Sequence, residues 1–320
     1  MHKIIRFYNQ NRKQIIRVIT IITFIIILIQ MLNYIYKNRT DSNNQNYISS
    51  GNNNSNISNI GTIVSNKSAI TDTKVDNEKL NDDVTVINEF IENCNERNIE
   101  KAYSLLSNEC KEEMYPTAKD FYENYYMMVF NNNKLEYSVE NWIQDTYEVK
   151  FIEDMLATGK INDENKQDYI TIVEENDSFK ININNYIGRE ILNKEIENND
   201  IILNLIQKDI YMDYEVYKIT IKNNTGKSIL LAPEDKTNTI YLQNTNGGKF
   251  YAASSELLKE ELLLENNYIH TIDVKFNKTY SYSNNIECLA FSNVVLDYEE
   301  YLNLDDKDKY EDIYNLQINL

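Results

Sequence analysis

The chain has few of the residues from which compact reactive sites are built. Its 320 residues include two histidines, three cysteines, seven glycines and two prolines. Three cysteines cannot make a disulfide framework, and we interpret Cys94, Cys110 and Cys288 as small buried apolar residues. One histidine is His2, so a Ser-His-Asp or Cys-His centre is excluded from the first folded segment, which has no histidine. No Cys/His group has the spacing of a metal site, and we predict no metal, no cofactor and no catalytic residue.

The scarcity of glycine also excludes a phosphate-binding loop. The residues 225–228, Thr-Gly-Lys-Ser, end like such a loop, but the glycine required five residues before Gly226 is replaced by Ile221. The chain is rich in Asn, Ile, Lys and Tyr and poor in Gly and Pro. This composition is typical of an AT-rich genome, so the 25 tyrosines are not by themselves a binding signature.

Acidic residues are absent from residues 1–39, which carry seven lysines and arginines. Residues 40–320 then carry 25 basic against 50 acidic residues, a net charge of −25. Nucleic acid and anionic lipid both attract basic patches, so we exclude nucleic acid as a partner of this acidic portion. A soluble, self-repelling surface is the simplest interpretation, and divalent cations or basic partners stay open.

Charge is also absent from the nineteen residues 18–36, VITIITFIIILIQMLNYIY. As a helix this run would measure about 28 Å, close to the hydrocarbon thickness of a bilayer. Five basic residues precede it and two follow, which predicts a single-pass signal anchor with residues 1–17 as a cytoplasmic tail and the C-terminal domains extracellular. The alternative is a cleaved signal peptide, but residues 30–34 are too bulky for its cleavage site.

Large apolar residues are rare in residues 37–78, which we predict to be a disordered Asn/Ser-rich linker. Order is expected from residue 79 onward. Val84, Ile87, Ile91 and Cys94 follow a helical stripe, and a shorter helix is predicted from Ile99 to Leu106.

A third helix is predicted to open at a capping box and to give way to strands. Thr117 and Asp120 form the box, and the expected buried side chains of the helix are Phe121, Tyr125, Met128 and Val129. Apolar residues then alternate with polar ones over residues 135–139, 147–155 and 179–183, with a further strand at 168–174 and a tight turn at 175–177. Helices followed by an antiparallel sheet predict an α+β domain over residues 79–186.

The segment 87–107, INEFIENCNERNIEKAYSLLS, with Tyr115-Pro116 and Asp120-Phe121 after it, resembles the opening of an NTF2-like domain. Such cone-shaped (cystatin-like) α+β domains occur in membrane-anchored exported proteins of Gram-positive, Clostridium-like bacteria. The resemblance implies that Ala102 lies where two helices approach closely and that Tyr103 and Leu106 fill the cone. It implies a fold but no activity, because this fold serves enzymes, ligand binders and interaction modules.

After a predicted bridge, residues 187–200, short strands recur between Asn/Gly turns, which predicts a β-sandwich over residues 201–300. The phrase EVYKITIKNNTGKSILL (215–231) is similar to a hairpin of immunoglobulin-like (Ig-like) modules in exported Gram-positive proteins. Residues 255–264 are predicted to be a helical insertion, and residues 301–320 an acidic tail. His270 alternates in phase with Ile272, Val274 and Phe276, so we interpret it as a structural histidine of the sandwich.

Three carboxylates are candidate bases for an enzyme of this fold, namely Asp145, Asp154 and Asp168, although none is paired in the sequence with a recognisable oxyanion arrangement. We therefore expect a non-catalytic cell-envelope interaction or scaffolding protein, displayed outside the membrane, whose partners are other envelope proteins or the cell wall. Two alternatives stay open. One is binding of a small ligand or wall fragment in the NTF2-like pocket. The other is a VirB8-like bitopic component of a secretion or conjugation apparatus.

Overall fold

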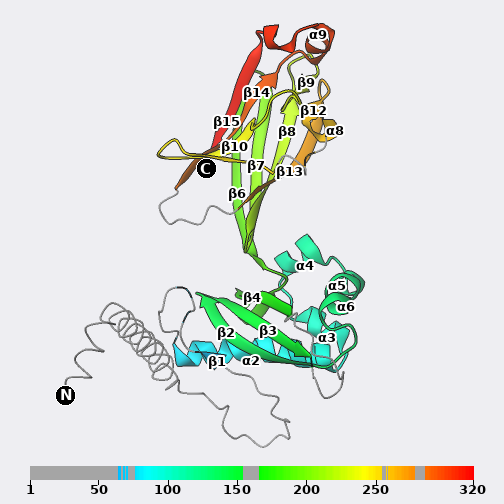
Figure 1. Cartoon of the computed structure of the whole chain (residues 1–320), viewed down its shortest axis with the longest axis vertical. Coiled ribbons are helices and arrows are strands. Elements are labelled where there is room, and N and C mark those ends of the chain that lie inside the picture. Colours follow the sequence, from blue (N-terminus) through cyan, green and yellow to red (C-terminus); the bar gives the residue numbers. More distant parts are fainter. Residues whose placement is uncertain are drawn as a thin grey trace, which may run out of the picture. The chain divides into compact units, whose positions relative to one another are not determined.

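The computed structural model describes residues 64–65, 68, 70, 76–153, 166–253, 257, 259–277 and 285–320. Strands, arranged in three sheets, hold more of these residues than helices do, and the helices are few (Figure 1). Among the described residues, no helix combines the length and the apolar composition needed to cross a membrane. The predicted fold class, a membrane helix followed by an α+β NTF2-like cone and an Ig-like sandwich, is therefore corrected to a mostly β-sheet chain. The segments predicted as a cytoplasmic tail and a membrane helix, residues 1–36, lie outside the described residues, as does most of the predicted linker 37–78.

The N-terminal part begins with the longest described helix, α2 (Asn77–Asn95). The Asp76 carboxylate accepts hydrogen bonds from the backbone N–H groups of Glu78 and Lys79 and so caps the helix start. The predicted stripe is buried, with Ile87, Ile91 and Cys94 at 0% exposure. Two short helices follow, α3 (Ile99–Ser104) and α4 (Asn108–Met114).

The third predicted helix exists but contains a π-helical turn. It runs through α5 (Ala118–Phe121), η1 (Tyr122–Tyr126) and α6 (Met127–Val129), and the predicted capping box of Thr117 and Asp120 is confirmed. The wider turn holds one more residue than an α-helical turn, which shifts the buried face. Tyr126 and Phe130 therefore point inward, whereas Met128 is 71% exposed and does not fill the interior as predicted.

A five-stranded sheet completes the N-terminal part. Its order is β1-β2-β3-β4-β5, and all pairs are antiparallel except β1 with β2. The strands are β1 (Val64–Ser65), β2 (Leu135–Ile143), β3 (Thr146–Glu153), β4 (Lys166–Glu175) and β5 (Ser178–Asn182). Aromatic rings fill the space between this sheet and the helices, with neighbouring centroids 5.4–6.1 Å apart: Phe90, Tyr103, Tyr115, Phe121, Tyr125, Phe130 and Phe151.

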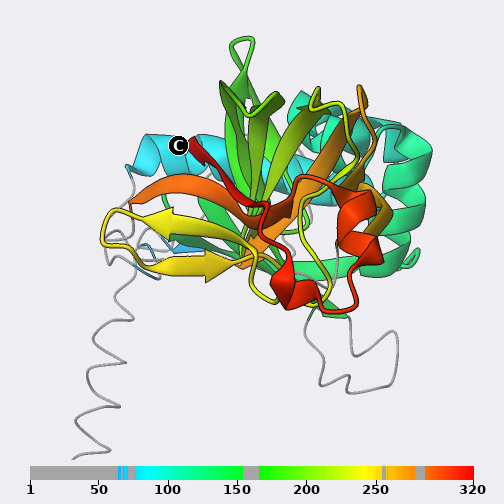
Figure 2. The same cartoon turned by 90° about the horizontal axis from the view of Figure 1, so that it is seen from above.

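The C-terminal part is built from two sheets. One has the order β13-β8-β7-β6, and the other contains β11-β10-β14 with β15 on the far edge of β14. Figures 1 and 2 show β15, in red, running beside β14, in orange. The strands are β6 (Tyr186–Asn198), β7 (Ile201–Tyr211), β8 (Tyr214–Asn223), β10 (Ile240–Asn244), β11 (Lys249–Tyr251), β13 (Ile269–Asn277), β14 (Ile286–Val295) and β15 (Ile313–Asn319).

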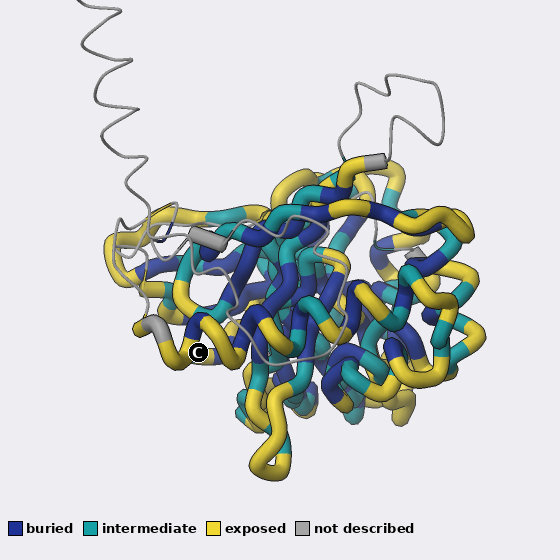
Figure 3. The backbone as a smooth tube through the Cα atoms, turned by 90° about the horizontal axis from the view of Figure 1, so that it is seen from below, coloured by how far each residue is buried: buried dark blue, intermediate teal, exposed yellow. Residues whose placement is uncertain are grey.

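Short elements complete this part: β9 (Ile229–Leu230), α8 (Lys259–Leu262), β12 (Leu263–Leu264), α9 (Tyr298–Asn303) and η2 (Lys307–Lys309). The inward residues of both sheets share one apolar core that includes Leu203, Ile219, Val274, Phe291 and Leu316. In Figure 3 the buried residues, in dark blue, concentrate in the interior, and the exposed residues, in yellow, lie largely at turns. As predicted, Cys94, Cys110 and Cys288 are buried, and their thiols are free.

Two predicted boundaries are wrong. Residues 187–200 were expected to be a bridge, but they form β6 and the turn that pairs it with β7. Residues 301–320 were expected to be an acidic tail, but they contribute part of α9, η2 and β15, whose Leu316 and Ile318 are buried. In both cases charged or amide residues occupy the outward positions and hide the apolar alternation.

Asparagine supplies most of the backbone conformations that glycine usually provides. Fourteen non-glycine residues of the described chain have positive φ, and ten of them are asparagines. Asn176 and Asp177, with φ of 51° and 59°, join β4 to β5, and Asn199 and Asp200, with φ of 49° and 58°, join β6 to β7. Two consecutive residues of positive φ form the tight turn that matches the twist of a hairpin. A chain poor in glycine thus still closes its hairpins.

The closed packing of the N-terminal part predicts a large effect for Phe151→Ala. Phe151 is 3% exposed, and its ring meets Phe130 edge-on with centroids 5.4 Å apart. Truncation should lower the free energy of unfolding by about 3–5 kcal/mol, because it leaves a cavity. The neighbouring Ile152, 44% exposed, is the matched control, and Ile152→Ala should change stability by less than about 0.5 kcal/mol. Urea unfolding measures both, and equal effects would show that the interior is open.

Candidate functional site

Asp168, a predicted candidate base, is a buried structural acceptor. It lies on β4 and is 3% exposed. The Tyr125 hydroxyl donates to its Oδ2 at 2.7 Å, and the backbone N–H groups of Asn184 and Asn185 donate to its two oxygens at 3.0 and 3.1 Å. Burial raises the pKa of Asp168, and these hydrogen bonds oppose the rise. The carboxylate thus joins β4, η1 and the β5–β6 turn and faces no solvent.

A second candidate base, Asp145, is not brought to Asp168. Asp145 lies in the β2–β3 turn, where it forms an ion pair with Lys79 of α2. Both of those side chains are about half exposed. Asp154 lies outside the described residues. The structure therefore does not assemble Asp145 and Asp168 into one site.

A second buried carboxylate, Asp83 of α2, has an oxygen without a partner. Asp83 is 0% exposed, and the Tyr147 hydroxyl donates to its Oδ2 at 2.7 Å. Among the described residues, Asp83 Oδ1 and Asn141 Oδ1 are buried and have no hydrogen-bond partner. Asn141 and Tyr147 face each other across β2 and β3. Burial raises the pKa of Asp83 above its usual range.

The most extensive polar cluster surrounds Arg189 of β6. Its Nε donates to Asp209 Oδ1 at 2.7 Å, its Nη1 to Glu112 Oε2 at 3.1 Å, and its Nη2 to Glu113 Oε2 at 3.0 Å. Asp209 lies on β7 of the same sheet, whereas Glu112 and Glu113 lie on α4. One guanidinium therefore ties a helix of the N-terminal part to the first two strands of the C-terminal part.

Further hydrogen bonds saturate the carboxylates of this Arg189 cluster. Asp209, 1% exposed, also accepts from the Tyr186 hydroxyl at 3.0 Å and from Gln207 Nε2 at 2.7 Å. Glu113 accepts from the Tyr211 hydroxyl at 3.1 Å. Burial, followed by the charge of Asp209, raises the pKa of Glu113. All three nitrogens of the Arg189 guanidinium are engaged within the protein, so we interpret the cluster as a structural joint.

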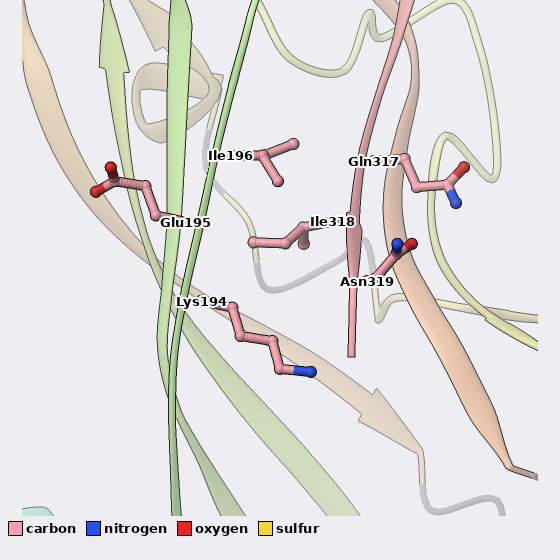
Figure 4. Close-up of a pocket in the computed structure, with 6 residues that line it drawn as sticks. All are labelled: Lys194, Glu195, Ile196, Gln317, Ile318 and Asn319. Carbon is pink, nitrogen blue, oxygen red and sulfur yellow. The ribbon is translucent and has the colours of Figure 1, made fainter.

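An open site lies elsewhere, between the outer strands of the two C-terminal sheets. A groove of about 440 Å³ separates β6 from β15. Figure 4 shows Ile196 and Ile318 pointing into the gap from the two strands, with Lys194 below them. The lining residues are Lys194, Glu195, Ile196, Gln317, Ile318 and Asn319. Within the described chain, β6 and β15 are each paired on one edge, with β7 and β14 respectively. We call this site the β6–β15 groove.

The backbone of β15 turns hydrogen-bonding groups toward the groove. The Leu320 N–H donates to the Glu287 carbonyl at 2.8 Å, which makes these two residues a hydrogen-bonded pair. Such pairs alternate along antiparallel strands, so Ile318 also faces β14 through its backbone. Gln317 and Asn319, the intervening residues, direct their N–H and C=O groups away from β14.

The same argument applies to β6. The two-residue turn Asn199–Asp200 makes Asn198 and Ile201 a hydrogen-bonded pair. Counting back along β6, Glu195 and Glu197 direct their backbone groups away from β7. The β6–β15 groove is thus bordered on both sides by backbone groups that no described strand pairs.

No match to this chain is found among protein-family models, curated proteins or solved structures. The site must therefore be argued from its geometry. Within the described ranges, no group of three or more His, Cys, Asp or Glu side chains is placed to hold a metal ion. The sequence argument missed both the Arg189 cluster and the β6–β15 groove. The three carboxylates of α4, Glu109, Glu112 and Glu113, could have indicated that a basic residue elsewhere in the chain pairs with them.

The unpartnered oxygen of Asp83 predicts that Asp83→Asn stabilises the protein at neutral pH. The amide keeps an acceptor for Tyr147 and replaces Oδ1 by a donor, with an expected gain of about 1–3 kcal/mol in unfolding free energy. Because the folded state raises the pKa of Asp83, its contribution is fully present below the unfolded pKa and is lost as pH rises through the folded pKa. The gain should therefore grow as pH rises above the pKa of an unfolded aspartate, about 4, as urea unfolding at a series of pH values would show. A gain that is the same at every pH would contradict this assignment.

The Arg189 cluster predicts that Arg189→Met is strongly destabilising. Removing the guanidinium leaves Asp209 buried without a counter-charge, at an expected cost of about 3–5 kcal/mol. The double variant Arg189→Met/Asp209→Asn should recover part of this loss, because it removes the stranded charge as well. Thermal unfolding of the three proteins gives the coupling energy. Strictly additive effects would mean that the two residues do not interact.

Proposed function

We propose that this chain is a non-catalytic interaction protein of the cell envelope that holds a partner through the β6–β15 groove. The observation that carries the proposal is the pair of unpaired strand edges that border this groove. Unpaired edges attract further strands, and natural proteins usually cover or blunt them. Here they flank a groove in which Ile196 points toward Ile318, a residue that is 1% exposed.

The alternative of a small ligand or wall fragment inside the N-terminal part has less support. The space where a pocket would lie contains the side chains of Phe90, Phe121 and Tyr125, which are at most 2% exposed. Their rings pack within 5.6–6.1 Å of one another. The carboxylate nearest to them, Asp168, is engaged by three protein donors. A VirB8-like role gains no support either, because the two-sheet C-terminal part departs from that pattern.

The envelope location rests on the sequence. The charge is divided between a basic segment of residues 1–39 and an acidic remainder of net charge −25. This division favours export of the acidic portion. An exported acidic surface repels anionic polymers and selects neutral or basic partners.

Site-directed photo-crosslinking in intact cells tests this function. A benzophenone amino acid at Gln317 places the reactive group in the groove, and the same substitution at Thr271 places it on the free edge of β13, outside the groove. We expect one prominent protein adduct from position 317 and none of the same mass from position 271, with mass spectrometry identifying an envelope protein. Equal adducts at both positions, or a cytoplasmic partner, would overturn the proposal.

A further inference from the structure

We propose that the outer face of the sheet that contains β11, β10, β14 and β15 binds a neutral, hydroxyl-rich polysaccharide. This inference goes beyond the proposed function, because it concerns another surface of the C-terminal part and another class of ligand. Three observations favour it: an exposed aromatic pair, side-chain amides in the same rows as this pair, and the absence of carboxylates from these rows.

The register of the strands places eight side chains in two rows on this outer face. The first row crosses the four strands through Tyr251, Tyr241, Ala290 and Gln317. The second row crosses them through Lys249, Gln243, Cys288 and Asn319. The residues that alternate with these, such as Leu242, Leu289 and Ile318, belong to the apolar core. Successive residues of a strand point to opposite faces, so the eight side chains point outward. We call these eight residues the amide face.

The orientation on β15 can be followed in Figure 4. Ile318 points to one side of the strand, toward Ile196, whereas Gln317 and Asn319 point to the other side. Gln317 and Asn319 are exposed, and Ile318 is buried. The amide face is therefore accessible at β15, and it is separate from the space between Ile196 and Ile318.

The aromatic pair lies at the β11 end of the amide face. The ring centroids of Tyr241 and Tyr251 are 6.1 Å apart, with an angle of 75° between the ring planes. Lys249 Nζ lies 4.0 Å from the Tyr241 centroid and covers one face of that ring. Tyr251 is 45% exposed, so part of its ring is accessible to a ligand. A tyrosine combines a flat apolar ring with a polar tip, which matches a sugar ring that has C–H groups on its faces and hydroxyls at its edge.

Side-chain amides continue the amide face toward β15. An amide has two donors and an acceptor oxygen, and a hydroxyl has one donor and two acceptor lone pairs, so Gln243, Gln317 and Asn319 can pair with sugar hydroxyls in either direction. Between them, Ala290 and Cys288 are 3% and 1% exposed, because their longer neighbours close over them. The surface is thus even, and its rows cross four strands, or about 14 Å. Such a platform suits a linear oligosaccharide.

Charge favours a neutral ligand. None of the eight residues of the amide face is acidic, and Lys249 is the one basic residue among them. By contrast, the outer face of the other C-terminal sheet carries charges of both signs on neighbouring strands, namely Glu195, Glu197, Lys218, Lys222 and Asp273. The whole chain has a net charge of −18 and repels an anionic polysaccharide. A cationic segment would find no carboxylate on the amide face, whereas a neutral polysaccharide needs none.

Titration of the full chain with tetrasaccharides tests the assignment. The neutral probes are cellotetraose, chitotetraose and maltotetraose, tetragalacturonate is the anionic probe, and calorimetry measures each dissociation constant. We expect at least one neutral probe to bind with a dissociation constant below about 1 mM. It should bind at least about tenfold more tightly than tetragalacturonate, because the chain repels negative charge. Its affinity should change by less than about twofold between low and high salt, because no ion pair forms.

Substitutions connect binding to the amide face. Tyr251→Ala removes the exposed ring and should weaken the best neutral probe at least about tenfold. Tyr268→Ala is the matched control, because Tyr268 is 50% exposed and its ring stacks on His270 of β13, in the other sheet. This control should leave the affinity unchanged. If Tyr251→Ala does not fold, Gln243→Ala replaces it and should weaken binding about threefold or more, because it removes hydrogen bonds to the sugar.

The assignment is wrong if none of the three neutral probes binds, if tetragalacturonate binds as tightly as they do, or if the tyrosine variants at positions 251 and 268 have equal effects. A concentration-dependent dimer that Tyr251→Ala abolishes would assign the amide face to a second copy of the chain and would also overturn the proposal. The titrations use sugars and the crosslinking captures proteins, so either proposal can fail while the other stands.

Discussion

The arrangement of the described chain depends on one guanidinium and the carboxylates around it. Arg189 lies three residues into β6, where the chain leaves the N-terminal sheet, and it contacts Asp209 on β7 and Glu112 and Glu113 on α4. A buried carboxylate such as that of Asp209 is unfavourable unless it is paired with a positive charge. Here the ion pairs of Arg189 connect three elements, β6, β7 and α4. The long strand β6 leaves this joint and the antiparallel β7 returns to it, and the apolar core of the C-terminal part lies along the far portions of both strands. A polar interaction therefore sets where two apolar cores can form.

Asparagine adopts the backbone conformations that glycine, which is scarce in this chain, usually provides. Most described positions of positive φ carry Asn, whose short side chain tolerates the left-handed region better than other residues do. Two of these residues also bind a buried group. Asn184 and Asn185 turn the chain after β5, and their backbone N–H groups donate to the buried Asp168. The abundant asparagines are thus part of the hydrogen bonding of the fold.

Local patterns in the sequence predicted the elements in which apolar residues follow a regular helical or strand period. The stripe of α2, the capping box at Thr117 and the strands of the N-terminal sheet were found where the periodicity indicated them. The pattern failed where an element has mixed inward positions, as in β6 with Lys194 between Leu192 and Ile196, and where a π-helical turn shifted the buried face away from Met128. The groove could not be predicted, because it arises from the spacing of two strands more than 100 residues apart in sequence. The Arg189 cluster likewise depends on partners that are 20 to 77 residues away in sequence.

The position of β15 in the chain has a consequence for synthesis. This strand follows every other described strand of its sheet, yet it covers one edge of β14 with residues as buried as Leu316 and Ile318. While the ribosome is still making residues 296–320, β14 has an open apolar edge, and its closing contacts await the last strand. Pairings between distant segments form slowly and leave such edges exposed to other chains. We infer that the C-terminal part completes its fold only once β15 has emerged from the ribosome, and that a chaperone acting before then would bind at β14.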